Sequence, residues 1–462
     1  MQTKEDLVKN VPLMMGGLML GLLLSALDNS IVATAMPRIV EDLHGMAYYS
    51  LPFTVYLLFS TVAIPVAGKL SDVFGRKKVM LWGMVCFLLT SVLCALSRSM
   101  LMLVLARGFQ GACGGVVGAS VFIIVSEIFP PEERGKYIGI VASMHGLASL
   151  LGPVLGGVIT EYMSWHWIFL INIPVGLVSF FLLFRNLPLL KHADEENRTF
   201  SLKGLVLFLL SIFPLLLCIV EGGRLLPWRS PLLLILFAVS CCLLYAFVRS
   251  ERKSHAPILP PRLLKNRIFQ KAAFTGAMGY VGLFGLVLYV PYLLQVVLRK
   301  DAAFSGMMML PMTLSMVAGG MIGGFTISRY QRYCRSGVIH LLVAISGFSM
   351  LLFFGQDISM PQLGIALLLS GIGIGMNFPL INIAPQSIIS ATEMGILVSS
   401  VEFFQIIGGV ISTSVFGKML ESSRSLILLL CIVALVAGII SVSLLDEKAI
   451  RRGFARQRGD LA

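Results

Sequence analysis

Long apolar stretches alternate with short polar stretches along the whole chain. Each of fourteen apolar stretches has at least 18 residues, which is enough for a helix to cross a hydrocarbon core of about 30 Å. The sequence therefore predicts fourteen transmembrane helices, near residues 11–37, 48–68, 78–97, 100–126, 137–160, 166–185, 202–221, 230–249, 272–297, 305–328, 336–355, 361–385, 394–417 and 424–445.

The polar stretches divide these predicted helices into groups of six, two and six. A charged segment, 191–198, follows the sixth helix, and a basic segment, 249–271, follows the eighth. We expect an all-α integral membrane protein with three parts. These are an N-terminal six-helix bundle (1–190), two additional helices with flanking loops (191–268), and a C-terminal six-helix bundle with a basic tail (269–462).

Composition excludes an ordinary soluble enzyme. Of the 462 residues, 57% are hydrophobic and only 13% are charged, whereas a soluble domain has about 25% charged residues. The sequence has no phosphate-binding Gly-rich loop ending in Gly-Lys-Ser/Thr, no His-Glu-x-x-His and no nucleophile elbow. We expect neither enzymatic activity nor ATP-driven transport.

The net charge of +13 does not require a nucleic-acid partner. With the N-terminus placed in the cytoplasm, most Lys and Arg residues fall in predicted cytoplasmic loops, as the positive-inside rule requires. The chain is therefore expected to have both termini in the cytoplasm and the lipid bilayer as its surroundings; a bacterial plasma membrane is what the family resemblance described below implies.

Cysteine usage indicates neither disulfides nor a metal site. Seven of the eight cysteines lie in predicted helices, and Cys334 lies in a loop with no nearby Cys or His at metal-ligating spacing.

The loop after the second predicted helix carries the strongest motif. It reads Gly68-Lys69-Leu70-Ser71-Asp72-Val73-Phe74-Gly75-Arg76-Lys77-Lys78 and resembles the signature Gly-x-Leu-Ala-Asp-Arg-x-Gly-Arg-Lys of the major facilitator superfamily. The resemblance implies that Gly68, Asp72, Gly75 and Arg76 control conformational switching. Val73 stands where the family often has arginine, so the resemblance predicts that one partner of the usual ion pair is missing.

Further motifs in the same order along the chain resemble one branch, the fourteen-span drug:proton antiporters. They are Leu27-Asp28-Asn29-Ser30-Ile31-Val32, Ala106-Arg107-Gly108-Phe109-Gln110-Gly111, Gly152-Pro153-Val154-Leu155-Gly156-Gly157, Trp165 to Pro174, and Pro291, Gln295, Gly306 and Pro311. The resemblance implies the major facilitator fold, in which two six-helix bundles rock about a central cavity, here with two extra central helices. It also implies proton-coupled export.

The Gly152 to Gly157 segment has a physical reading of its own. Gly152 and Gly156 lie four residues apart on one helical face and permit close approach of another helix, while Pro153 removes an intrahelical hydrogen bond. Static small-residue packing and a role in switching both remain open.

Only three charged residues lie well inside predicted helices: Asp28, Arg107 and Glu402. Charges in a membrane are costly and are candidates for function. We assign all three to proton coupling or substrate binding. The alternatives are an Asp28–Arg107 ion pair that only neutralises both charges, and a protonated Glu402 that only packs.

Several other polar residues are weaker candidates for a functional role. A histidine has an ordinary pKa suited to carrying protons, but for His145 we favour a neutral side chain that is hydrogen-bonded to its neighbours and keep proton transfer as the alternative. Gln110 and Gln295 are secondary candidates from the motifs. Four carboxylates at helix ends are expected to be solvated: Glu127, Glu161, Glu221 and Glu393.

Together these features predict a monomeric antiporter that uses the proton gradient, with no cofactor or metal. It exports hydrophobic, amphipathic compounds, cationic or zwitterionic. The alternatives are an exporter of one antibiotic, lipid or metabolite, a nutrient symporter or uniporter, and a non-transporting membrane sensor on the same fold.

Overall fold

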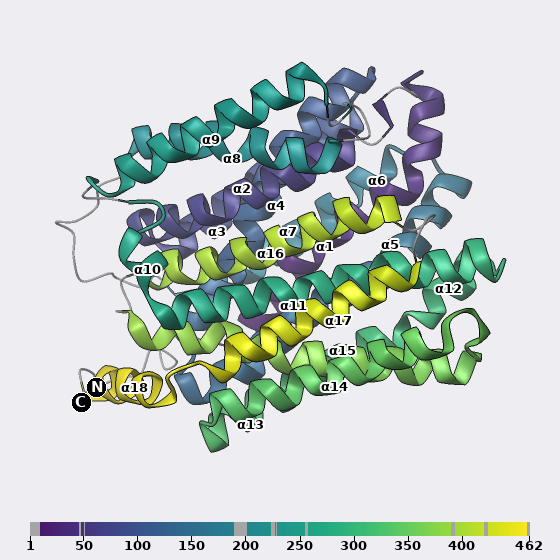
Figure 1. Cartoon of the computed structure of the whole chain (residues 1–462). Helices are drawn as coiled ribbons and strands as arrows, with labels where there is room; N and C mark the ends of the chain where they lie inside the picture. The colour runs from purple at the N-terminus through teal and green to yellow at the C-terminus, as the bar shows by residue number, and fades with distance from the viewer. Residues whose placement is uncertain are drawn as a thin grey trace. The chain divides into compact units, whose positions relative to one another are not determined.

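The computed structural model describes residues 10–45, 48–49, 51–188, 201–222, 227, 229–254, 257–389, 393–419 and 424–459. These residues form helices and no strand (Figure 1). The α-helices are α1 (Val11–Asp42), α2 (Leu51–Phe74), α3 (Arg76–Ala95), α4 (Met100–Ile128), α5 (Pro131–Tyr162), α6 (Trp167–Leu170), α7 (Asn172–Asn186), α8 (Leu202–Glu221), α9 (Pro231–Glu251), α10 (Pro261–Lys265), α11 (Arg267–Tyr292), α12 (Ala302–Met308), α13 (Leu310–Tyr330), α14 (Tyr333–Phe354), α15 (Met360–Ile383), α16 (Met394–Met419), α17 (Arg424–Ser443) and α18 (Glu447–Gly459). Short π and 3₁₀ turns are η2 (Leu293–Val297), η3 (Gly355–Asp357) and η4 (Ala384–Ile388).

The predicted all-α membrane fold is confirmed. Each of the fourteen predicted spans coincides with helix, and the described residues include 13 helices long and apolar enough to cross a membrane. The 32-residue helix α5 occupies the remaining predicted span. The span predicted at 166–185 corresponds to α6 and α7. Ile171, which joins them, has helical φ and ψ values of −60° and −24°, so the two helices form one continuous span.

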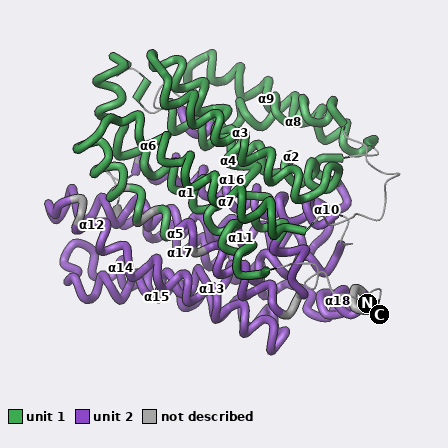
Figure 2. The backbone as a smooth tube through the Cα atoms, turned by 180° about the vertical axis from the view of Figure 1, so that it is seen from behind, with its two compact units in different colours: residues 1–124, 147–218, 222–260 green, residues 125–146, 219–221, 261–462 purple. Residues whose placement is uncertain are grey.

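The chain forms two compact units (Figure 2). Unit 1 comprises residues 1–124, 147–218 and 222–260, and unit 2 comprises residues 125–146, 219–221 and 261–462. Helix α5 contributes its first half to unit 2 and its second half to unit 1. The three-part division at 190/191 and 268/269 stays a prediction.

Local sequence explains where several helices begin. The Asn266 side chain accepts a hydrogen bond from Ile268 N at 2.9 Å and so caps α11. Ser359 and Gln362 form a capping box at the start of α15. Between α2 and α3 the chain turns at Gly75, whose φ of 92° is a conformation that glycine adopts without strain.

The core of unit 1 forms where α1 packs against α6 and α7. Ile31, Val32 and Phe169 are buried there. Trp165 Nε1 donates to Asp42 Oδ2 at 2.8 Å, which ties the end of α1 to the segment before α6. This packing holds α1, and with it the Asp28 side chain, inside the unit.

The basic C-terminal tail is folded in unit 2 as helix α18. Its apolar side chains Ile450 and Phe454 are buried, and the helix packs on η4. Cys334 N donates to Glu447 Oε1 at 2.7 Å, which anchors the start of the helix.

Candidate functional site

A carboxylate and a guanidinium meet in the interior of unit 1. Asp28 on α1 and Arg107 on α4 form an ion pair between Asp28 Oδ2 and Arg107 Nη1, and both side chains are 0% exposed. Each of these two buried charges is stabilised by the other, because either one alone would have a large desolvation free energy with no attraction to offset it.

Neutral polar side chains complete this ion pair. Gln110 Nε2 and Asn172 Nδ2 both donate to Asp28 Oδ1, at 2.9 and 2.8 Å. The same two nitrogens lie 2.7 and 3.1 Å from Ser91 Oγ. Gln110 Oε1 in turn accepts from Arg107 Nη1 at 2.8 Å. Helices α1, α3, α4 and α7 therefore converge on one polar cluster, which we call the Asp28 network.

Aromatic rings cover the guanidinium. Arg107 lies over the ring of Tyr56 with a distance of 4.2 Å to the centroid, and 5.8 Å from that of Phe169. Tyr56 is held in place because its hydroxyl donates to Ser25 O at 2.9 Å. Ring faces attract a cation when water is excluded. The Asp28 network is therefore bounded by aromatic rings as well as by polar side chains.

The Asp28 network retains unused hydrogen-bonding capacity. Arg107 Nε and Nη2 and Asn172 Oδ1 are buried and have no hydrogen-bond partner among the described residues. Leaving such groups unpaired costs free energy. A change in the protonation of Asp28 would therefore let the guanidinium and the amides rearrange.

The sequence located part of this cluster. It predicted Asp28, Arg107 and Gln110, and the structure brings all three into contact. Sequence reasoning missed Ser91, Asn172 and Tyr56. Asn172 lies in one of the recognised motifs, and a polar side chain inside an apolar helix was the available signal.

The motif segment 68–78, which is helical on both sides of Gly75, contains a second buried ion pair in unit 1. Arg76 Nη1 lies 2.5 Å from Asp72 Oδ1, and the side chains are 1% and 8% exposed. Asp72 therefore has a cation in Arg76, a residue of the motif itself, although Val73 supplies none. The effect of the missing arginine at position 73 stays a prediction. Gly68 is buried one turn before Asp72 on α2.

We predict that Asp72→Asn slows transport while equilibrium substrate binding stays within a few-fold. The variant removes the anion from a buried ion pair that links two helix ends, and breaking such a pair costs about 3–5 kcal/mol. Pre-steady-state transport and substrate binding measure the two effects separately. Glu41→Gln, which breaks an exposed Arg38–Glu41 pair, is the control with little expected effect. Lost binding with normal turnover per bound complex would contradict the prediction.

The second half of α5 packs closely on α1. A Cβ atom at Gly156 would meet Thr34 Oγ1 and would lie 2.9 Å from Ile31 O. A Cβ atom at Gly152 would meet the side chain of Ser30. At Gly157 no atom lies within 4 Å of the equivalent position. Gly152 and Gly156 are therefore packing positions, and Gly157 is open; Pro153 lies in the same helix.

We predict that Gly156→Ala destabilises the protein by about 1–3 kcal/mol, because an added methyl group overpacks the α1–α5 contact. Gly157→Ala is the matched control and should be neutral or slightly stabilising, since alanine favours helix more than glycine does. Thermal unfolding in detergent measures both. Thr34→Ala should partly rescue Gly156→Ala, and equal unfolding temperatures for the two alanine variants would refute the packing explanation.

Glu402 lies in unit 2, on α16, and is 8% exposed. Its Oε2 atom has no hydrogen-bond partner among the described residues. Tyr280 on α11 is near enough to interact electrostatically with it. Gln405 lies one turn along α16, beside Gly276 of α11, and its Nε2 is likewise unpartnered in the described part of the chain. Sequence reasoning missed Tyr280 and Gln405.

Tyr280 belongs to a group of rings. Its centroid lies 5.8 Å from that of Phe378 and 6.0 Å from that of Phe284. Phe403 and Phe404 follow Glu402 directly in the chain. In the structure, the ring centroid of Phe404 lies 6.0 Å from that of Phe269 on α11.

The remaining candidates lie apart from these clusters. His145, on the unit 2 part of α5, and Gln295, in the π-helical turn η2, both have exposed side chains. Two expectations about helix ends are wrong, because Glu127 and Glu221 are buried, at 6% and 3% exposure. Among the described residues, no three His, Cys, Asp or Glu side chains are grouped as metal ligands would be.

Apolar helices around buried charges are typical of a multi-pass membrane protein, and the comparisons with known proteins indicate a transporter rather than an enzyme. The family model of the Major Facilitator Superfamily matches residues 18–413. The chain belongs to the major facilitator superfamily.

Two relatives from Bacillus subtilis are each 34% identical to the chain. The multidrug transporter protein MdtP matches over 421 residues, 91% of this chain and 77% of the relative. Multidrug resistance protein 3 matches over 406 residues, 87% of this chain and 78% of the relative. The family resemblance found in the sequence motifs is thereby confirmed.

Solved structures share the fold at low sequence identity. The human organic anion transporter MFSD10 superposes with a TM-score of 0.70 at 15% identity, covering 93% of this chain and 99% of that one. The proton:xylose symporter XylE gives a TM-score of 0.67 at 14% identity, covering 93% and 94%. These likenesses establish the architecture only.

Proposed function

We propose that this protein exports hydrophobic, amphipathic compounds, cationic or zwitterionic, in exchange for protons. The observation that carries the proposal is the buried Asp28 network, a carboxylate whose charge is matched by one guanidinium and two amides. Relatives named as multidrug transporters support efflux as the direction of transport.

Asp28 is the proton-coupling group in this proposal. A proton on Asp28 removes its attraction for Arg107 and leaves the guanidinium to seek other acceptors. Because both side chains are 0% exposed, the proton must exchange while the helices around the network are parted. Proton exchange is thereby tied to the change between inward-open and outward-open states.

Glu402 is the substrate-binding carboxylate in this proposal. A buried carboxylate needs a proton, an ion-pair partner or water, and a hydrophobic cation provides such a partner for as long as it stays bound. The Asp72–Arg76 ion pair and the Gly152 to Gly157 segment are assigned to conformational switching, and His145, Gln110 and Gln295 to secondary roles.

The driving force in this proposal is the inward proton gradient, worth about 2.3 kcal/mol per charge for each 100 mV of potential, plus the pH difference. No cofactor takes part. We place the protein as a monomer in a bacterial plasma membrane with both termini in the cytoplasm.

Proteoliposomes with an acidic interior test the proposal. An external lipophilic cation, such as a fluorescent dye, should enter as protons leave, so an internal pH indicator should report alkalinisation that depends on the dye. Dye entry without a pH change would indicate a uniporter. The absence of both dye entry and proton release would favour a non-transporting sensor.

A further inference from the structure

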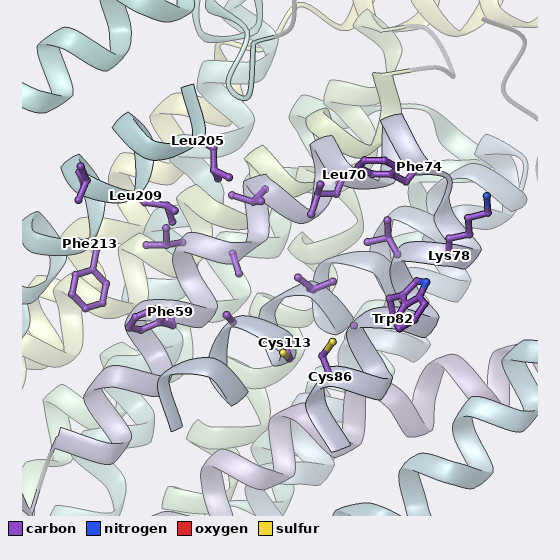
Figure 3. Close-up of a pocket in the computed structure, with 18 of the residues that line it drawn as sticks. Phe59, Leu70, Phe74, Lys78, Trp82, Cys86, Cys113, Leu205, Leu209 and Phe213 are labelled. Carbon is purple, nitrogen blue, oxygen red and sulfur yellow. The ribbon is translucent and has the colours of Figure 1, made fainter. Parts of the chain in front are cut away.

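Unit 1 contains a cavity of about 700 Å³ that lies outside the Asp28 network. Helices α2, α3 and α4 form one wall, and α8, the first of the two additional helices, forms the other (Figure 3). Lining side chains such as Trp82 and Leu210 are 68% and 52% exposed, so the cavity opens on the surface of the unit.

The two ends of the cavity differ in chemistry. Lys78 lies beside Phe74 and Trp82 at one end, whereas Phe59 and Phe213 lie at the other end (Figure 3). The rings of Phe59 and Phe213 contact edge to face at 4.8 Å. Between the ends the lining is aliphatic apart from Cys86 and Cys113. Among the described residues, Lys78 is the one charged residue that lines this cavity.

Lys78 is available to a ligand, although its neighbour is not. Lys77 Nζ donates to the carbonyl oxygens of Phe184 and Leu187 at the end of α7, at 2.7 and 2.6 Å. Lys78 is exposed, and no described residue forms a hydrogen bond or ion pair with it. The two adjacent lysines therefore differ: Lys77 binds the end of α7, whereas the Lys78 side chain is exposed.

We propose that this cavity binds an anionic phospholipid, with the phosphate at Lys78 and an acyl chain along α2, α3 and α8. A single cation at one end of a long apolar lining matches the charge distribution of such a lipid. Small-molecule sites instead carry several convergent polar groups. Lys78 would repel a lipophilic cation, and Trp82 has the amphipathic character typical of the membrane–water interface.

This site is independent of the proposed efflux activity, because it concerns the outer surface of unit 1 and not the buried charges. It gives the additional helix α8 a specific role, since α8 supplies Leu205, Leu209 and Phe213 to the wall. A bound lipid would fill the space between α8 and the bundle formed by α2, α3 and α4.

Quenching of Trp82 fluorescence by lipids with brominated acyl chains tests the proposal in detergent-purified, full-length protein. The Trp82→Phe variant gives the background from the other tryptophans. We expect brominated phosphatidylglycerol to occupy the site about fivefold more tightly than brominated phosphatidylcholine, which is the value of about one lysine–lipid charge interaction.

Lys78→Gln should reduce the preference for phosphatidylglycerol over phosphatidylcholine from about fivefold to less than about twofold, because the single lysine–lipid charge interaction is lost. Lys203→Gln, which removes an exposed lysine of α8 outside the cavity, should leave the preference unchanged. Ala63→Phe and Ala112→Phe each fill the cavity and should weaken quenching by both lipids; a single monodisperse species on gel filtration shows that each variant is folded.

Three results would overturn the proposal. They are equal quenching by the two lipids, a preference for phosphatidylglycerol that survives Lys78→Gln, and displacement of the brominated lipid by the lipophilic cation tetraphenylphosphonium. The last result would identify the cavity as a drug site. No transport is measured, so failure here leaves the proposed antiport untouched.

Discussion

Asp28→Asn is expected to abolish proton release coupled to substrate movement. Asparagine keeps the size of the side chain, and its oxygen still accepts from Gln110 and Asn172. It cannot exchange a proton, however, and it leaves Arg107 without its anion. Removing one partner of a buried ion pair costs about 3–5 kcal/mol, so the variant should also unfold at lower temperature. The internal pH indicator in proteoliposomes and thermal unfolding measure the two effects.

A double variant separates coupling from stability. Asp28→Asn with Arg107→Gln removes both charges, so most of the lost stability should return while proton coupling stays absent. Glu161→Gln, which neutralises an exposed carboxylate on α5, is the control and should behave like the wild type. If Asp28→Asn kept normal dye-dependent proton release, Asp28 would have no role in coupling and its ion pair with Arg107 would be structural.

The membrane-spanning helices could be predicted from sequence because each is a long, apolar stretch that can be recognised without its neighbours. Helix α18 was missed. Its strongly basic sequence predicted no membrane span. In the structure Ile450 and Phe454 of this helix are buried, and the helix packs on η4.

The candidate site was predictable only for residues that are conspicuous on their own. Asp28 and Arg107 stand out as charges in apolar helices, but the contact between them joins positions 79 apart in the chain. Asn172 reaches Asp28 across 144 positions. Such contacts follow from the way the helices pack, and no local pattern records them, so Ser91 and Tyr56 were not identifiable as partners.

Two properties of Glu402 support the proposal that it binds positively charged substrates. Its side chain is buried, and Oε2 has no hydrogen-bond partner in the described part of the chain. Tyr280 on α11 interacts with it electrostatically, and the Tyr280 ring centroid lies 6.0 Å from that of Phe284 and 5.8 Å from that of Phe378. A lipophilic cation would satisfy the carboxylate by charge and the rings by apolar contact and cation–π attraction. A protonated Glu402 that only packs would need neither partner.

Glu402→Gln should therefore weaken export of cationic dyes by about tenfold or more, because interactions with a charged group are worth about 1.5–3 kcal/mol. Export of neutral and zwitterionic compounds by the same preparation is the internal control and should change far less. Tyr280→Phe should retain cation export, since the ring face remains, whereas Tyr280→Leu should lower it. Equal losses for both classes of compound would assign Glu402 to proton coupling, and no loss for either would mean that Glu402 serves packing alone.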